Sequence, residues 1–221
     1  MLALIQGKPM IQRVYEQVCQ SKSLTRLIIA TDDERILETC KGFGAEAWMT
    51  SPDHSSGTER AGEVAEKIST PVIINVQGDE PLIRGDVIDE LVAFLQDESV
   101  PMATLAVRNC DLDFLSEPNT VKIVTDNEGN ALYFSRSPLP FRASDYFLQH
   151  IGVYGYQKDF LMELRRIPPS RLELAEKLEQ LRILEHGYRI KVIESKYPTL
   201  SVDVPEDIIR VENFLRDHPN E

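Results

Sequence analysis

The clearest strand signal in the sequence is Val72-Ile-Ile-Asn-Val76, followed directly by Gln77-Gly-Asp-Glu-Pro81. The first segment is nearly continuous in apolar residues, which indicates a strand buried on both faces, as in a parallel sheet. A helical pattern over 86–96 follows the polar turn. Because ligands of open α/β sheets bind beyond the carboxyl ends of the strands, Asp79 and its neighbours are candidate site residues.

The same order of strand, loop and helix recurs on both sides of this stretch. Further strands are expected over 26–30, 45–49, 102–107, 150–156 and 188–194. Further helices are expected over 10–18, 34–40, from about 58, over 172–185 and over 205–216. Residues 121–126 and 131–135 flank a turn and predict one hairpin. The alternation predicts an α/β fold with a mostly parallel sheet, in one domain over 1–221.

The composition describes an acidic chain of ordinary globular make-up. The 221 residues contain 24 Lys+Arg and 36 Asp+Glu, a formal net charge of −12, and 42% are hydrophobic. This charge argues against a nucleic-acid polymer or a membrane surface as a partner. No apolar run approaches the roughly 18 residues of a membrane-spanning helix. Three scattered cysteines suit the reducing cytoplasm and predict no disulfide framework.

Two acidic residues follow expected strands and precede expected helices. Asp79 lies in the turn after 72–76, where Gly78 permits a close backbone approach or an unusual dihedral angle. Asp203 lies just before Pro205, which suits a first helical turn. Magnesium prefers one or two carboxylates together with phosphate oxygens. Each aspartate also fits an ordinary helix N-cap, and spacing alone leaves both interpretations open.

A third candidate is the small-residue loop His54-Ser-Ser-Gly-Thr-Glu-Arg60. The loop opens a helix, so its backbone N–H groups and the positive end of the helix dipole suit a nucleotide base, ribose or phosphate. Arg60 adds a planar fork of donors. The alternative is a surface loop with a helix cap. Gly7-Lys8-Pro9 lacks the spacing of a Walker loop, so we interpret it as a turn into the first helix.

Two further patterns receive ordinary structural interpretations. Asp111-Leu-Asp113 has the form of a glycosyltransferase metal signature but follows a strand as a solvated turn. In the helix expected over 172–185, three leucines form the predicted core stripe: Leu174, Leu178 and Leu181. The polar residues of that helix are expected to form a solvated face: Glu176, Glu179 and Gln180.

Six short segments carry a family resemblance through their order. They are 54–60, Asn75-Val-Gln-Gly-Asp-Glu-Pro81, Ala131-Leu-Tyr-Phe-Ser-Arg136, His150-Ile-Gly-Val-Tyr-Gly-Tyr156, Leu178-Glu-Gln-Leu-Arg182 and Val202-Asp-Val-Pro-Glu-Asp207. Together they resemble the 3-deoxy-manno-octulosonate (Kdo) cytidylyltransferases, or CMP-Kdo synthetases, from about Leu2 to Phe214. The resemblance implies a three-layer, Rossmann-like nucleotidyltransferase fold. It also implies transfer of CMP from CTP to Kdo, with release of pyrophosphate, for lipopolysaccharide synthesis.

The resemblance further implies roles for individual residues. Asp79 and Asp203 match the carboxylates that hold Mg²⁺ and serve catalysis. The nucleotide-contacting positions are Ser56, Gly57, Thr58, Arg60, Gln77 and Gly78. The positions of the Kdo pocket are Gln77, Arg136, His150, Tyr154, Glu179 and Gln180. Arg136 is expected to hold the sugar carboxylate through a bidentate pair. A homodimer is implied, with a hairpin and dimerisation region over 119–156.

Two features of the family are not matched in the sequence. Members begin with a buried strand and a loop whose Arg and Lys hold the triphosphate, and residues 1–9 align just after that loop. We therefore expect the chain to lack the strand and the loop and to be catalytically impaired. Residues 140–145 are also shorter than an insertion found in many members. The alternatives are a CMP-sialic acid synthetase-like enzyme, or an inactive homologue that binds the sugar acid.

Overall fold

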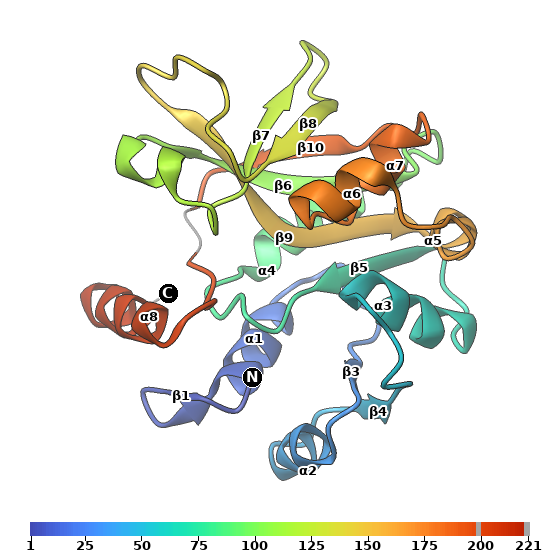
Figure 1. Cartoon of the computed structure of the whole chain (residues 1–221). Coiled ribbons are helices and arrows are strands. Elements are labelled where there is room, and N and C mark those ends of the chain that lie inside the picture. The colour runs from blue at the N-terminus through green and yellow to red at the C-terminus, as the bar shows by residue number, and fades with distance from the viewer. Residues whose placement is uncertain (198–199, 219–221) are drawn as a thin grey trace. The chain divides into compact units, whose positions relative to one another are not determined.

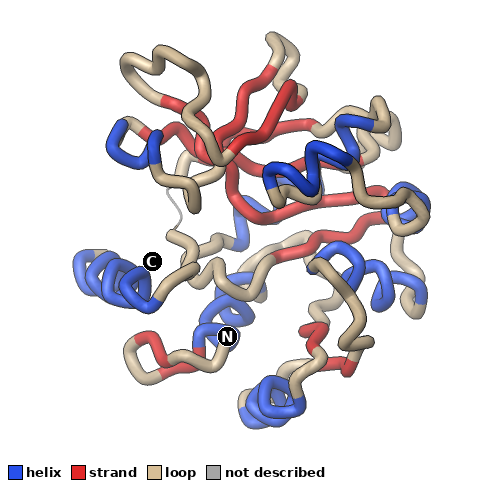
Figure 2. Tube along the Cα trace, viewed as in Figure 1, coloured by secondary structure: helices blue, strands red, loops and turns tan. Residues whose placement is uncertain are grey.

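The computed structural model describes residues 1–197 and 200–218, and the chain divides into two compact units. The first unit comprises Met1–Ile68, Val76–Glu90 and Thr199–Glu221. The second unit comprises Ser69–Asn75 and Leu91–Pro198. Figure 1 labels the helices and strands of both units, and Figure 2 colours them by type.

The first unit combines a short hairpin, a parallel pair of strands and several helices. The hairpin joins β1 (Leu4–Ile5) to β2 (Lys8–Pro9). Strand β3 (Ile29–Thr31) pairs in parallel with β4 (Ala47–Met49). The helices are α1 (Met10–Val18), α2 (Glu34–Gly42), α3 (Gly57–Glu66), the first part of α4 (Gly85–Phe94) and α8 (Pro205–Asp217).

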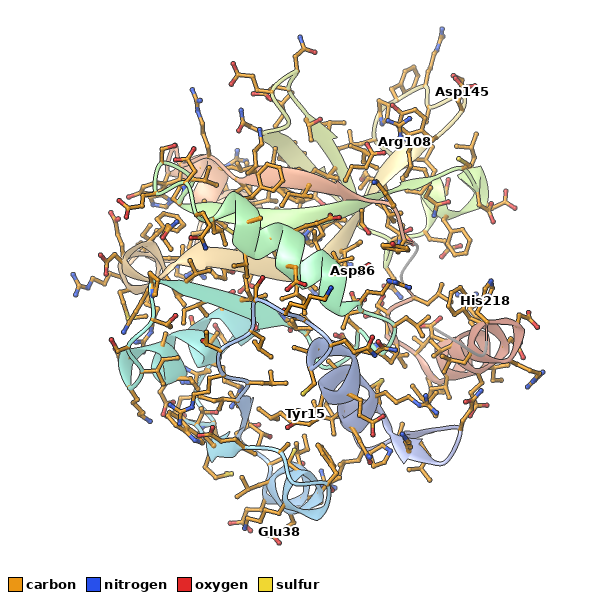
Figure 3. The ribbon with its side chains drawn as sticks, turned by 180° about the vertical axis from the view of Figure 1, so that it is seen from behind. Tyr15, Glu38, Asp86, Arg108, Asp145 and His218 are labelled. Carbon is orange, nitrogen blue, oxygen red and sulfur yellow. The ribbon has the colours of Figure 1, made fainter. Side chains whose placement is uncertain are left out.

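Two hydrophobic clusters hold the first unit together. One packs β1 and α1 against α8 and the segment before α4, through Ile5, Met10, Leu82, Val211 and Leu215. The other packs α1 against β3 and α2, through Ile11, Ile29, Cys40 and Ala45. Tyr15 of α1 points toward α2 (Figure 3), and its ring centroid lies 5.4 Å from that of Phe43. The apolar periodicity that predicted α1 is therefore its buried face.

The turn at Gly7-Lys8-Pro9 is part of a hairpin, where the sequence predicted only a turn into the first helix. Gln6 and Gly7 both have positive φ, at 47° and 78°. Two consecutive positive φ values match the twist of an antiparallel pair, which joins Ile5 to Lys8. No Walker-type glycine loop is formed here.

The second unit is built on one mixed sheet. Its strand order is β10-β6-β9-β7-β8, with β5 paired to β9. The strands are β5 (Val72–Val76), β6 (Met102–Asn109), β7 (Lys122–Thr125), β8 (Ala131–Ser135), β9 (Phe147–Gln157) and β10 (Lys191–Ser195). β10 runs parallel to β6, whereas β6–β9, β7–β8 and β7–β9 are antiparallel.

The prediction of a mostly parallel sheet is therefore wrong, and the connections explain why. Parallel neighbours need a long crossover, usually a helix. Between β6 and β9 the chain forms only the short 3₁₀ helix η1 (Leu112–Ser116), the β7–β8 hairpin and a loop over 136–146. Asp111 caps η1 by accepting from the Asp113 backbone N–H at 3.1 Å, which confirms an ordinary turn there. A continuous apolar run indicates that a strand is buried on both faces. It does not indicate whether that strand runs parallel or antiparallel to its neighbours.

Helices α6 (Arg171–Glu176) and α7 (Gln180–Glu185) lie over one face of this sheet (Figure 1). Helix α5 (Lys158–Leu164) continues directly from β9. In the described part of the chain, 1–197 and 200–218, no helix is long and apolar enough to cross a membrane.

The single helix predicted over 172–185 is broken into α6 and α7. Lys177 adopts the left-handed conformation, with φ 55° and ψ 47°. Arg182 then forms a bidentate ion pair with Glu173, at 2.5 and 2.7 Å. In a continuous helix these residues would be about 13 Å apart along the axis, so the pair requires the break. Leu174 of the predicted core stripe is 68% exposed, whereas Leu178 and Leu181 are buried.

Two glycines of the first unit give a matched test of packing. A Cβ built on Gly85, at the start of α4, lies 2.4 Å from the backbone N of Ser21. A Cβ built on Gly42, at the end of α2, meets nothing within 4 Å. Gly85→Ala is therefore expected to lower the free energy of unfolding by about 1–3 kcal/mol. Gly42→Ala should raise it by up to about 1 kcal/mol. Urea denaturation measures both, and equal effects would contradict this packing.

Candidate functional site

The turn after β5 is held against the segment that precedes α8. The backbone N–H of Glu80 donates to the Gln77 carbonyl at 3.3 Å, and the Glu80 side chain is buried. The Val202 N–H donates to the Asp79 carbonyl at 2.9 Å. A Cβ on Gly78 would lie 3.2 Å from the Ile11 side chain, so this glycine serves close packing. Its φ is not positive.

This contact brings the two predicted acidic residues together in the first unit. Burial raises the pKa of the half-buried Asp79, and the nearby Asp203 carboxylate raises it further. Asp203 is not the N-cap of α8. The Asp207 side chain instead accepts from the backbone N–H groups of Asp203 and Val204, both at 3.1 Å. Two adjacent carboxylates, one exposed, form a place where a cation would relieve their repulsion.

The loop 54–60 meets the same turn. Ser56 caps α3 by accepting from the Glu59 N–H at 3.3 Å. A Cβ on Gly57 would lie 2.9 Å from Nε2 and 3.0 Å from Oε1 of Gln77, so the Gln77 amide rests on the bare Gly57 backbone. The Thr58 side chain is buried. The structure therefore brings together five of the six predicted nucleotide positions: Ser56, Gly57, Thr58, Gln77 and Gly78.

Arg60, the sixth position, is engaged within the protein. Its Nη1 donates to Thr50 Oγ1 at 2.5 Å, and its Nη2 pairs with Asp32 at 2.9 Å. These contacts join α3 to the ends of β3 and β4. His54 is held in turn by Glu63, with 2.7 Å between Nε2 and Oε2. Lys67, with Ser51 and His54, lowers the pKa of Glu63 to about 2. Side-chain contacts of His54 and Arg60 therefore hold the loop at both ends.

Four of the predicted sugar-pocket residues gather in the second unit, on the sheet and on α7. His150 and Tyr154 lie on β9, with ring centroids 5.4 Å apart, and Phe134 packs edge-on to His150 at 5.1 Å. The Tyr154 hydroxyl donates to Gln180 Oε1 at 3.4 Å. Gln180 is 2% exposed, and its buried Nε2 has no hydrogen-bond partner among the described residues. Glu179, half-buried, precedes Gln180 at the start of α7.

The polar face expected to be solvated therefore faces the sheet. Gln180 is buried. Glu176 accepts from Ser135 Oγ at 2.8 Å and from the Arg136 N–H at 2.9 Å. The break at Lys177 gives α7 its own direction, so the side-chain directions predicted from one continuous helix do not apply to Gln180. An unsatisfied donor such as Gln180 Nε2 is costly to bury and marks a place where a polar ligand would be stabilised.

Arg136 follows β8 with two of its five N–H donors in use. Its Nε donates to the Glu176 carbonyl at 3.0 Å and its Nη1 to the Pro118 carbonyl at 2.9 Å. The end of the guanidinium, with Nη2 and the second Nη1 proton, retains the geometry for a bidentate carboxylate. Both guanidinium contacts are to backbone carbonyl oxygens, and in the described part of the chain no carboxylate forms an ion pair with it.

Sequence reasoning missed a buried lysine beside Arg136. Lys122 of β7 is fully buried, and its Nζ donates to the carbonyls of Glu117, Thr120 and Arg136 at 3.0, 2.7 and 2.5 Å. Burial lowers the pKa of Lys122, as does the neighbouring Arg136 charge. The ammonium ties the Arg136 backbone to the 117–120 loop. The alternating pattern of β7 carried no signal of this role.

Comparison with known proteins places these features in context. A family model described as cytidylyltransferase matches residues 1–192. The 3-deoxy-manno-octulosonate cytidylyltransferase of *Geobacter sulfurreducens* is 50% identical, over 97% of this chain and 92% of the relative. That of *Geotalea uraniireducens* is 51% identical, over the same shares.

Solved structures agree with the sequence relatives. A CMP:2-keto-3-deoxy-manno-octonic acid synthetase complexed with CTP is 39% identical, with a TM-score of 0.91 over 98% of this chain and 91% of that one. A 4-diphosphocytidyl-2C-methyl-D-erythritol synthase from *Anaerococcus prevotii* shares the fold at 15% identity and a TM-score of 0.65. These matches cover nearly all of this chain and about nine tenths of the CMP-Kdo synthetase relatives, so they do not support the prediction that a strand and a loop are missing. The prediction of impaired catalysis depended on that loss and is withdrawn with it.

Proposed function

Because this chain belongs to the 3-deoxy-manno-octulosonate cytidylyltransferase family, we propose that it transfers CMP from CTP to Kdo in lipopolysaccharide synthesis. The observation that carries the proposal is identity near 50% over 97% of the chain. The site residues expected from the resemblance support it, since they fall into two groups of suitable chemistry. One group lies in the first unit and the other in the second.

The nucleotide group belongs to the first unit. The backbone of 56–58, at the start of α3, offers N–H groups to the nucleotide, and Gln77 and Gly78 adjoin it. Asp79 and Asp203 would hold Mg²⁺. The fit is supported by the Asp203 carboxylate, which raises the pKa of the partly buried Asp79, and Mg²⁺ uses one or two carboxylates with phosphate and water oxygens. Bound there, the ion would neutralise phosphate charge during transfer.

The sugar-acid group belongs to the second unit. Arg136 would hold the Kdo carboxylate through the open end of its guanidinium. His150, Tyr154, Glu179 and Gln180 would contact the hydroxyls, and the buried Nε2 of Gln180 supports this assignment because it lacks a partner. A buried donor that needs an acceptor rejects analogues that cannot supply one.

The proposed reaction is a single substitution at phosphorus. The anomeric hydroxyl oxygen of Kdo attacks the α-phosphorus of CTP, and its proton is lost to water. The bond from that phosphorus to the β-phosphate oxygen breaks, and pyrophosphate leaves. Such chemistry requires alignment and charge stabilisation more than covalent help from the protein. The protein residues bind and orient both substrates.

Sugar-acid specificity tests the proposal against its rival. Pyrophosphate release from CTP is measured with Kdo and, separately, with N-acetylneuraminate, a sialic acid. The kcat/KM for Kdo should exceed that for the sialic acid by about 100-fold or more. The reverse preference would assign a CMP-sialic acid synthetase-like enzyme. Kdo binding by calorimetry without turnover would assign an inactive sugar-acid-binding homologue.

We further propose a homodimer formed through the β7–β8 hairpin and the loop 136–146. Both project away from the sheet (Figure 1), and Asp145 of this loop lies near Arg108 (Figure 3). Leu132 and Phe141 are 59% and 88% exposed there. Exposed apolar side chains of this size favour an interface.

Light scattering coupled to gel filtration tests the dimer. The wild-type chain should have twice the mass of one copy, and the double variant Leu132→Ser/Phe141→Ser should shift to the mass of one. Leu174→Ser, which removes an equally exposed leucine on α6, should leave the dimer intact. A monomeric wild type, or a double variant that remains dimeric, would contradict this interface.

A further inference from the structure

Thr104 of β6 makes two hydrogen-bond contacts, one of them with the ring of His150. Thr104 is fully buried. Its Oγ1 lies 2.8 Å from the Val153 carbonyl oxygen and 3.0 Å from Nε2 of His150. Neither Thr104 nor Val153 was a candidate site residue in the sequence.

The irregular pairing of β6 with β9 creates this arrangement. Thr104 stands opposite Tyr154 and Leu105 stands opposite Ile151, so Gly152 and Val153 have no partner on β6. The two extra residues form a bulge, a feature that often re-aims side chains beside functional sites. The Thr104 hydroxyl binds the Val153 carbonyl within the bulge. His150 and Tyr154 remain on the same face of the sheet as Thr104.

Counting protons then fixes the direction of each hydrogen bond. A threonine hydroxyl has one proton, and the Val153 carbonyl can only accept, so that proton is directed to Val153. Oγ1 must therefore act as the acceptor toward His150, which donates from Nε2. A neutral imidazole has one N–H, so Nδ1 is left as an acceptor. Burial lowers the pKa of His150 to about 3, which agrees with a neutral ring.

We propose that Thr104 is a positioning residue that fixes His150 in the Nε2–H tautomer, so that Nδ1 accepts a hydrogen bond from a hydroxyl of the sugar acid. This role for Thr104 rests on the proposed function, which supplies the sugar acid Kdo as the ligand. Phe134 and Tyr154 pack on the ring from two sides and limit its rotation. In the described part of the chain, no residue forms a hydrogen bond with Nδ1. The pocket would therefore select a sugar hydroxyl that donates a hydrogen bond to His150 Nδ1.

Nitrogen NMR of the imidazole rings tests the tautomer without substrate. In ¹⁵N-histidine-labelled protein, the His150 signals are assigned by their loss in His150→Gln. The wild type should show a protonated Nε2 and an unprotonated Nδ1. Thr104→Ser keeps the hydroxyl and should keep this pattern, whereas Thr104→Val should give a mixture of tautomers. A wild-type ring protonated at Nδ1, or an unchanged pattern in Thr104→Val, would overturn the proposal.

Kinetics then separates a positioning role from a general loss of stability. Thr104→Val should raise the KM for Kdo about tenfold while leaving the KM for CTP unchanged, and Thr104→Ser should restore most of the affinity. Should Thr104→Val fail to fold, the wild-type and Thr104→Ser spectra still decide the tautomer. If the wild type turns over no Kdo, the proposed function fails, yet the apo spectrum still reports on Thr104.

Discussion

Asp79→Asn is expected to lower kcat by about a thousandfold, the largest effect of any single substitution in this protein. The amide is nearly the same size as the carboxylate, so the turn after β5 keeps its hydrogen bonds from Glu80 and Val202, which involve backbone atoms. What is lost is one of the two charges that would hold Mg²⁺. Steady-state pyrophosphate release at saturating CTP and Kdo measures the change.

The matched control for this variant is Asp217→Asn. Asp217 is an exposed aspartate at the end of α8 in the same unit, so its neutralisation changes net charge equally. Its kcat should stay within twofold of the wild type. Because the carboxylates of Asp79 and Asp203 repel each other, Asp79→Asn should also be no less stable to urea. A stable Asp79→Asn protein with wild-type kcat at the same Mg²⁺ concentration would contradict the metal assignment.

Arg136→Met is expected to raise the KM for Kdo about 100-fold and to leave the KM for CTP within twofold. A bidentate, charge-assisted pair contributes roughly 3 kcal/mol, and each 1.4 kcal/mol is about tenfold in affinity. Arg136→Lys keeps the charge but loses the planar fork, so we expect it to recover only part of the loss. Initial-rate kinetics with each substrate varied in turn separates the two KM values.

Arg189→Met is the control for Arg136→Met. Arg189 is exposed in the same unit, and Arg189→Met removes the same charge. The kinetic constants of this variant should therefore match those of the wild type. Arg136 also donates to the carbonyls of Glu176 and Pro118, so its loss is expected to lower the free energy of unfolding by about 1–2 kcal/mol. Equal increases in both KM values would indicate a general distortion and would contradict a role in holding the sugar carboxylate.

Much of the fold could be predicted from the sequence, because its signals are local. The apolar run at 72–76 is a strand, the periodicity of 10–18 is a helix, and Pro205 begins the last helix. The direction of the strands could not be predicted, since burial on both faces does not depend on direction. The break at Lys177 was also hidden, because its cause is the distant pairing of Arg182 with Glu173.

The candidate site residues could be named from the sequence, but the contacts that bring them together could not be predicted. Asp79 and Asp203 are far apart in the sequence, and only the tertiary hydrogen bond between Val202 and Asp79 brings their segments together. The family resemblance predicted that Asp79 and Asp203 act together, which their spacing in the sequence could not indicate. Lys122 and Thr104 gave no signal, because a polar residue within a strand looks like an exposed position. Both are buried, and both donate hydrogen bonds to backbone carbonyls.

The reaction proposed for this chain joins CMP to Kdo with release of pyrophosphate. Phosphorus NMR of a mixture of the protein, CTP, Kdo and Mg²⁺ tests it most directly, with circular dichroism to confirm folding. CMP-Kdo and pyrophosphate should form in equal amounts, and no CTP should be consumed when Kdo is omitted or Mg²⁺ is chelated. Folded protein that forms no CMP-Kdo at saturating substrates, or that consumes CTP equally without Kdo, would contradict it.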